Sequence, residues 1–253
     1  MHLRSRENSV RQYRRTTILM IVIVCCSTIV CAQEVADTAE LASEDHYVFS
    51  PFPSQEWKLR GSLGLSLAIL PQPLTEYPTP APMLDIRYRF SMPLNCSVYG
   101  RLGSNIATSI VQAGGLFSLP VADLTIGAGW SVMFVYGNIT YVDGFNTTQQ
   151  RWINYPMVTA SYRFPKATLT ARIEAELTTS VESSLEDQTV VDDQDLRSGA
   201  SATLALEQPF FGRTHVIIGA TFQLSNQPYQ AWFLYNTFSD RLFSSEFFMG
   251  IIL

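Results

Sequence analysis

The stretch that decides the fold is EWKLRGSLGLSLAI, residues 56–69. Every second residue from Trp57 to Ile69 is apolar or glycine, whereas the residues between them are charged or small. Because alternate side chains of a strand point to opposite faces, this stretch predicts a strand with one apolar and one polar face. Its length suits a tilted transmembrane strand, which needs about 9–11 residues.

The same alternation recurs along the chain. In residues 83–92 it places Leu84, Ile86, Tyr88, Phe90 and Met92 on one face, and Asp85, Arg87, Arg89 and Ser91 on the other. Residues 124–137, 167–178 and 214–225 repeat the pattern, and no helical period competes with it. Three charged side chains on one strand are costly to bury unless they face water or each other. The pattern therefore predicts lipid outside and a polar interior.

Ten candidate strands follow from this pattern: 56–70, 83–92, 96–106, 110–119, 124–137, 152–164, 167–178, 198–207, 214–225 and 242–253. Their connections alternate between short and long, with one exception at 107–109, as in barrels with turns on one side and loops on the other. The fold class is thus an all-β, antiparallel up-and-down transmembrane barrel. Eight or twelve strands stay open, because 110–119 is weakly patterned and 231–238 could form a further strand.

The N-terminal region has the layout of an export signal. Five arginines precede an apolar run over residues 18–30, and Val30-Cys31-Ala32 provides a cleavage site with small residues. We expect residues 1–32 to be a cleaved signal peptide; an uncleaved anchor helix is the alternative. Residues 33–55 are acidic and lack alternation, which predicts a mobile periplasmic lead-in, and residues 56–253 form the barrel.

Cysteine and charge content exclude several classes. Three of the four cysteines lie in the signal, so the mature chain keeps Cys96 alone and cannot form an internal disulfide. The net charge is −5, and acidic residues gather in 33–55 and 179–198. A nucleic-acid partner is not expected, because no basic patch or stripe is present.

Aromatic residues gather near the ends of the expected strands, where amphipathic rings favour the membrane interface. The expected girdle residues are Trp57, Phe90, Tyr136, Trp152, Tyr155, Tyr162, Phe164, Phe210, Phe211, Trp232 and Phe238.

In these features the chain resembles the small outer-membrane β-barrel proteins of double-membraned bacteria, over residues 1–32 and 56–253. Proteins of this class usually end in a strand of alternating apolar residues with a terminal aromatic, which serves as the assembly signal. Here Phe247, Met249 and Ile251 supply the alternation, but the last residue is Leu253. The resemblance implies location in a bacterial outer membrane, with its lipid and its assembly machinery as partners; no surface partner can be named.

Charged side chains on the inward faces are the candidate site. They are Lys58, Arg60, Asp85, Arg87, Arg89, Arg101, Arg172, Glu174, Glu176, Glu207 and Glu246. A barrel of about eight to ten strands has a narrow lumen that side chains largely fill. Opposite charges there are expected to pair, because an unpaired charge away from water is costly. A side-chain plug is the first interpretation and a charged narrow pore lining is the second.

The sequence contains few residues or motifs that indicate an enzyme. The mature chain has only His46 and His215, and no P-loop, G-x-G-x-x-G, C-x-x-C or H-E-x-x-H motif. The Asp192-Asp193-Gln194-Asp195 run could gather a calcium ion but lacks EF-hand spacing, so a solvated loop tip is favoured. No cofactor or metal is expected. The expectation is a non-catalytic barrel with a structural or surface-interaction role; a narrow small-solute channel and an outer-membrane protease or lipid-modifying enzyme are the alternatives.

Overall fold

The computed structural model describes residues 46–71, 75, 77–139, 146–185, 188–191, 198–211, 214–232 and 241–253. In order, the elements are β1 (Leu59–Leu70), β2 (Thr79–Ser91), β3 (Cys96–Ser104), β4 (Thr108–Val121), β5 (Leu124–Ile139), β6 (Thr147–Phe164), β7 (Ala167–Leu185), β8 (Gln188–Val191), β9 (Gly199–Pro209), β10 (His215–Ser225), the one-turn 3-10 helix η2 (Tyr229–Ala231) and β11 (Leu242–Ile252). Among these residues no helix is long and apolar enough to cross a membrane.

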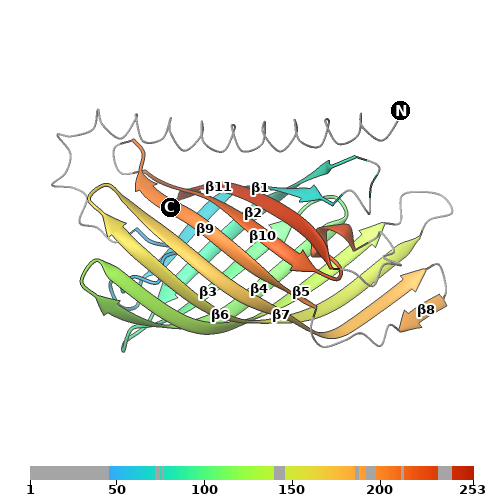
Figure 1. Cartoon of the computed structure of the whole chain (residues 1–253), viewed down its shortest axis with the longest axis horizontal. Helices are drawn as coiled ribbons and strands as arrows, with labels where there is room; N and C mark the ends of the chain where they lie inside the picture. Colours follow the sequence, from blue (N-terminus) through green and yellow to red (C-terminus); the bar gives the residue numbers. More distant parts are fainter. Residues whose placement is uncertain are drawn as a thin grey trace, which may run out of the picture. The chain divides into compact units, whose positions relative to one another are not determined.

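Ten of the strands close into an antiparallel barrel (Figure 1). Each pairs with the next along the chain, β7 pairs with β9, and β11 closes the ring against β1. The short β8 pairs with the end of β7 and stands outside the ring. The prediction of a ten-stranded up-and-down barrel is confirmed, and of the counts left open, eight and twelve are excluded.

The strand bounds differ from the predicted ones mainly at one end of the barrel. β2 begins at Thr79 rather than residue 83, β6 begins at Thr147 rather than 152, and β7 runs to Leu185 rather than 178. The β6 and β7 extensions are mostly polar, and the β2 extension holds Pro80 and Pro82, so the apolar alternation that marks a membrane span is absent in all three. Backbone pairing of β6 with β7 continues through them nevertheless.

The two barrel ends differ in their connections. One end, the turn end, has the short connections 92–95, 122–123, 165–166 and 210–214. The other, the loop end, has the connections 71–78, 105–107, 140–146, 186–198 and 226–241. The alternation of short and long connections is confirmed, including its exception, which spans only 105–107.

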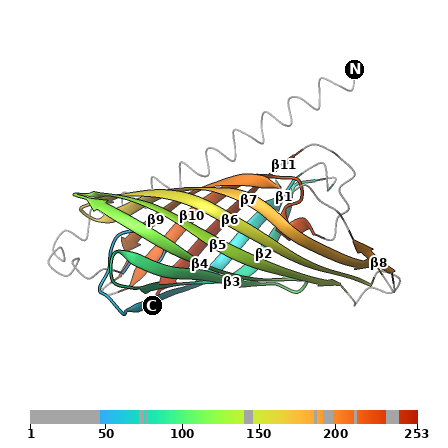
Figure 2. The ribbon, with the colours of Figure 1, turned by 90° about the horizontal axis from the view of Figure 1, so that it is seen from below.

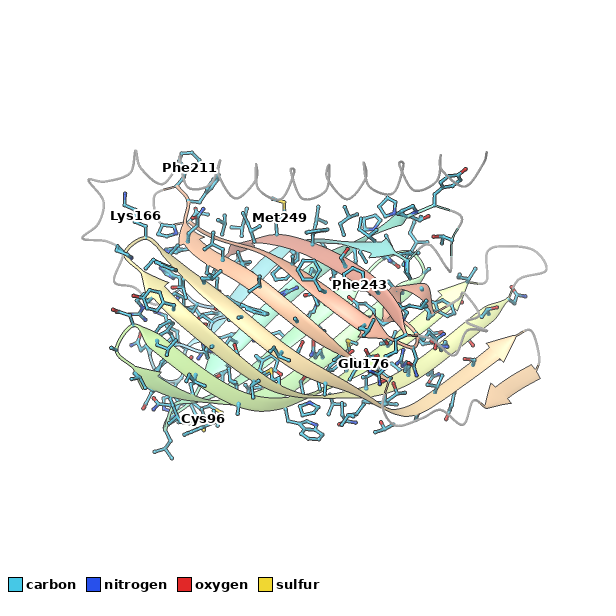
Figure 3. All side chains as sticks on the ribbon, in the orientation of Figure 1. Cys96, Lys166, Glu176, Phe211, Phe243 and Met249 are labelled. Carbon is cyan, nitrogen blue, oxygen red and sulfur yellow. The ribbon has the colours of Figure 1, made fainter. Side chains whose placement is uncertain are left out.

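Side-chain facing follows the predicted alternation. On β1 the leucines at 59, 63, 65 and 67 are 39–65% exposed, whereas Ser62, Ser66 and Ala68 are 2–3% exposed. On β2, Leu84 is 48% exposed and Asp85 is 3% exposed. The apolar face therefore covers the outside of the barrel, and the polar face fills its interior (Figure 3).

Outward aromatic pairs mark both rims. At the turn end the ring pairs are Trp57–Phe90, Tyr162–Phe164 and Phe210–Phe211, and towards the loop end they are Phe134–Trp152 and Phe222–Phe243. Two predicted girdle residues are wrong, because Tyr155 is 6% exposed and Trp232 is 3% exposed, and both lie inside. Phe238 lies outside the described residues.

The predicted lead-in needs correction over its last residues. Residues 46–54 belong to the same compact unit as the barrel, and Val48, Phe49, Ser50 and Phe52 are buried. They pack against inward residues of β9, β10 and β11, namely Ala205, Ile217, Phe248 and Ile252. Residues 1–32, the expected signal peptide, and residues 33–45 of the predicted lead-in lie outside the described residues. In Figures 1 and 2 this segment (blue) and η2 (red) lie towards opposite ends of the barrel.

Candidate functional site: a lumen filled from both ends

A charge cluster crosses the middle of the lumen. Asp85 on β2 binds Arg87 on the same strand and Arg101 on β3, each at 2.9 Å. Arg101 also binds Glu246 on β11, so the cluster joins strands on both sides of the β1–β11 seam. Asp85 and Glu246 are 3% and 5% exposed. Alternating charges of this kind satisfy one another where bulk water is absent.

η2 caps this cluster from the loop end. The Tyr229 hydroxyl donates to Glu246 Oε2 at 2.7 Å and accepts from Arg101 Nη1 at 3.2 Å. Gln230 Nε2 donates to the same carboxylate oxygen at 3.2 Å. Burial raises the pKa of the Tyr229 phenol well above its ordinary value, so the hydroxyl keeps its proton as a donor.

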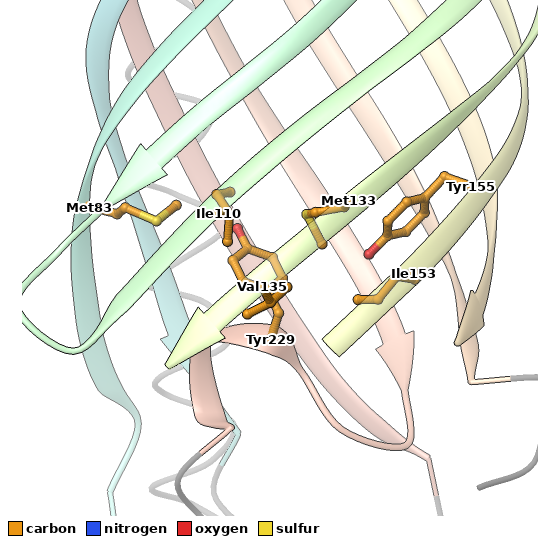
Figure 4. Packing of buried hydrophobic residues seen from close by; sticks show 7 residues of the cluster. All are labelled: Met83, Ile110, Met133, Val135, Ile153, Tyr155 and Tyr229. Atoms are coloured by element: carbon orange, nitrogen blue, oxygen red, sulfur yellow. The ribbon is translucent and has the colours of Figure 1, made fainter. Parts of the chain in front are cut away.

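Apolar side chains surround Tyr229. They come from β2, β4, β5 and β6 and are Met83, Ile110, Met133, Val135, Ile153 and Tyr155 (Figure 4). Trp232 follows η2, and its Nε1 donates to Thr108 Oγ1 at 2.9 Å. A Cβ at Gly137 would lie 2.1 Å from the Trp232 ring, so glycine is required where this ring meets the wall. The start of the β10–β11 connection is thus a built part of the interior.

A second ion pair lies nearer the loop end. Arg151 on β6 and Glu176 on β7 are each 1% exposed, and Arg151 Nη2 lies 2.8 Å from Glu176 Oε1. Glu176 also accepts from Gln223 Nε2 at 2.7 Å and from Ser225 Oγ at 3.1 Å. Arg151 donates to the carbonyl of Gln227, just before η2, at 2.6 Å. This pair therefore ties β6, β7 and β10 to the inserted loop.

The turn end is filled by the N-terminal segment, residues 46–54. Glu207 on β9 accepts three consecutive backbone N–H groups through its two carboxylate oxygens, from Val48 at 2.8 Å, Phe49 at 2.9 Å and Ser50 at 2.8 Å. One buried carboxylate thus satisfies backbone donors that no strand partner satisfies.

Arginines hold the other side of the segment. Arg172 on β7 donates to the Phe49 carbonyl at 3.2 Å and lies 3.9 Å above the Phe49 ring. Arg89 on β2 donates to the carbonyls of Ser50 and Pro51. Arg163 on β6 lies 4.4 Å from the centre of the Phe52 ring. Cation–π contacts of this kind are worth about 2 kcal/mol or more when desolvated.

The structure brings most predicted residues into these clusters. Asp85, Arg87, Arg101 and Glu246 form the central one, whereas Arg89, Arg172 and Glu207 bind the N-terminal segment. Glu176 belongs to the loop-end pair. The remaining three predicted residues are less buried: Glu174 accepts from Ser201 at 3.4 Å, Arg60 is half-buried, and Lys58 lies at the mouth and contacts Gln55 in an exposed position. Lys58 is therefore not part of the buried network.

Sequence reasoning missed Arg151 and Arg163. Arg151 stood in a predicted loop, although it lies two residues before Ile153 and shares the phase of the inward residues Thr159 and Ser161. Extending the alternation of inward residues from Ile153 towards the N-terminus would have placed Arg151 in the lumen. No pattern could have found the partners of Glu207, because they are backbone groups 157–159 residues away in sequence.

The described ranges contain few candidate sites for metal binding or catalysis. There, no group of three or more His, Cys, Asp or Glu side chains is placed to hold a metal ion. The Asp192–Asp195 run lies outside those ranges. His46 and His215 meet at the turn end, with ring centres 4.2 Å apart. A small cavity beside Asp85 and Arg87 has about 10 Å³ of space, at the lower limit of what one water needs.

A closed antiparallel barrel with an outward apolar face, aromatic rims and a polar interior is a transmembrane β-barrel of the outer-membrane type. Solved structures with a similar fold include Neisserial surface protein A, at 10% identity and TM-score 0.37, matched over 77% of this chain and 96% of that one. The attachment invasion locus protein Ail of Yersinia pestis matches at 10% identity and TM-score 0.35, over 79% and 100%. CymD, described as a monoaromatic hydrocarbon channel, matches at 8% and 0.28, over 78% and 88%.

No protein-family model and no curated protein sequence matches the chain.

Proposed function

We propose that this chain is a non-catalytic outer-membrane barrel that is closed at rest and has a structural or surface-interaction role. The observation that supports this most is that both ends of the lumen are filled by backbone segments rather than by side chains alone. Residues 46–54 fill the turn end and residues 227–232 fill the loop end. Between them lie the charge clusters of Asp85, Arg101 and Glu246 and of Arg151 and Glu176, which cross the lumen between strands.

The loop end supplies the surface on which such a role depends. β6 and β7 continue past the Phe134–Trp152 aromatic pair, with residues 147–151 paired to residues 181–185. β8 extends this sheet beyond the ring (Figure 1). A β-sheet that continues beyond the aromatic rim suits contact with another surface, because its backbone is already paired before the contact forms.

Conductance of the refolded protein in a planar bilayer tests the closed state. We expect no stable single-channel steps from the wild-type chain. Large and stable currents would overturn the closed barrel and favour the alternative function, a narrow small-solute channel. One observation favours that alternative: residues 46–54 are held by side-chain packing, hydrogen bonds and ring contacts, and they pair with no strand in the part of the chain described.

A further inference from the structure

Arginines face one another across neighbouring strands at the turn end and in the middle of the lumen. Arg60 on β1 lies directly opposite Arg89 on β2, and Arg87 on β2 lies directly opposite Arg101 on β3. Like charges in directly opposed positions destabilise a sheet. At Arg87 and Arg101 the shared carboxylate of Asp85 offsets this repulsion. The stability of the barrel wall alone therefore gives no reason to place arginines opposite one another.

Among the described residues, arginines outnumber carboxylates in the turn-end half of the lumen. The arginines are Arg60, Arg87, Arg89, Arg163 and Arg172, and the carboxylates are Asp85, Glu174 and Glu207. The guanidinium groups of Arg89 and Arg172 point at the carbonyl oxygens of Phe49, Ser50 and Pro51. These carbonyls occupy positions where the oxygens of an anion would bind, since guanidinium groups match carboxylate and oxyanion geometry.

The segment that supplies these carbonyls can leave without breaking the sheet. Residues 46–54 form no strand, and Pro51 and Pro53 lack the N–H that strand pairing uses. Every barrel strand keeps its two neighbours without this segment. Its described attachments include the Glu207 hydrogen bonds, the arginine contacts, the Ser54–Ser91 hydrogen bond, the His46–His215 ring contact and the packing of Val48 and Phe49.

We propose that residues 46–54 are a removable plug over an anion-binding cup, whose wall includes Arg87, Arg89, Arg163 and Arg172. The ligand class is a small solute with a carboxylate or oxyanion group that enters from the turn end. The segment takes the place of this ligand at rest. This inference goes beyond the closed barrel proposed above, because a barrel can be closed at rest whether or not its plug can leave.

The test measures access to the cup with charged thiol reagents on the full chain. Serine replaces Cys25, Cys26, Cys31 and Cys96, so that no native thiol remains, and Ser62→Cys places a new thiol beside Arg87 and Phe248, on the wall of the small cavity. Labelling rates are compared for an anionic and a cationic methanethiosulfonate of similar size. The plug is loosened by Phe49→Ala with Phe52→Ala, which leaves the barrel wall unchanged. Glu56→Gln, at an exposed position after the segment, is the matched control.

We expect slow labelling with the native plug and with Glu56→Gln. The loosened plug should raise the rate at least about tenfold, and the anionic reagent should then react about tenfold faster than the cationic one, the lower range of electrostatic focusing in charged clefts. Arg172→Gln in the loosened chain should reduce this charge preference. Lys166→Gln, the same charge change at an exposed turn of the same end, should leave it unchanged.

Two results would overturn the inference. Unchanged labelling in the loosened chain would show that the segment is a fixed part of the interior. Equal rates for the two reagents, or a faster cationic one, would show that the space it fills is not an anion site. A heat-modifiable gel shift verifies folding of each variant. If the double substitution prevents folding, Phe49→Leu keeps the apolar volume, removes the ring beside Arg172 and is judged by the same two results.

Discussion

At the residue scale, buried ion pairs fix how the lumen is filled. Arg151 and Glu176 are both 1% exposed, and each has further polar partners. A buried pair adds little net stability compared with an apolar pair of the same shape, but breaking it leaves a charge without its counterion in a place of low dielectric. The pair therefore matters more for specifying one arrangement of β6, β7 and β10 than for total stability.

Glu176→Gln should destabilise the folded barrel, because it removes the counterion of Arg151. Breaking a buried pair costs about 3–5 kcal/mol, and we expect the lower value since Thr178 and the Gln227 carbonyl still accept from Arg151. The measurement is the free energy of unfolding in lipid by denaturant titration. Glu174→Gln, two residues away on the same face and only half-buried, is the control and should change it little. Equal losses for the two would show that the ion pair is not what stabilises this region.

Sequence alone could find which residues point inward but not what they bind. Strict alternation on β2 was enough to place Asp85, Arg87 and Arg89 in the lumen. Alternation cannot tell that Arg87 pairs with Asp85 while Arg89 binds the carbonyl of Ser50, because the second contact joins a strand to a segment with no periodic pattern. Tyr155 shares the inward phase of Thr159 and Ser161, so alternation could have placed it inside, whereas Trp232 follows η2, where no alternation indicates the direction of a side chain.

At the element scale, the strands were predictable because lipid imposes one rule on all of them. Each must cross the membrane over about 9–11 residues in which every second side chain is apolar and faces lipid. β1 does so from Leu59 onward. Beyond the membrane this rule no longer applies. The ends of β6 and β7 and all of β8 continue the sheet by backbone pairing, which leaves no hydrophobic signature.

Leu65→Arg should impair assembly into lipid far more than Leu59→Arg. Both side chains face outward, at 60% and 65% exposure, but Leu65 lies in the middle of β1 and Leu59 at its start beside Trp57. An outward arginine costs about 2–4 kcal/mol at the bilayer midplane and about 0–1 kcal/mol near the interface. Folded yield in lipid vesicles measures the difference. Comparable yields would contradict the membrane depth assigned to β1.

Deleting residues 186–196 should leave the barrel closed. This removes β8, whose pairing is with the end of β7 outside the ring, and shortening a long loop changes closure entropy only slowly. The heat-modifiable gel shift of a folded barrel is the measurement, and we expect it to be retained. Its loss would mean that this connection stabilises the barrel itself and does not merely extend the sheet at the loop end.

At the scale of the whole molecule, two separate segments enter the lumen, and the closed barrel proposed above has one closure at each end. Residues 46–54 fill the turn end around Glu207, whereas η2 and Trp232 fill the loop end around Glu246 and Thr108. The two closures contact different residues, although both reach β2, β6 and β11, and they share no hydrogen bond among those described. They stand in series along one path, so an ion must pass both to cross the membrane.

Conductance should therefore appear only when both closures are loosened. Phe49→Ala with Phe52→Ala loosens the turn end, and Tyr229→Ala with Trp232→Ala loosens the loop end by removing two buried side chains. Each pair alone should leave the planar bilayer without stable currents, because the other closure still blocks the path. All four substitutions together should produce single-channel steps.

Tyr229→Phe is the control for the loop end, since it removes the hydrogen bond to Glu246 but keeps the ring among Ile110 and Met133. Currents from either pair alone would show that one closure carries the whole barrier, and that the segment at the other end does not seal the lumen.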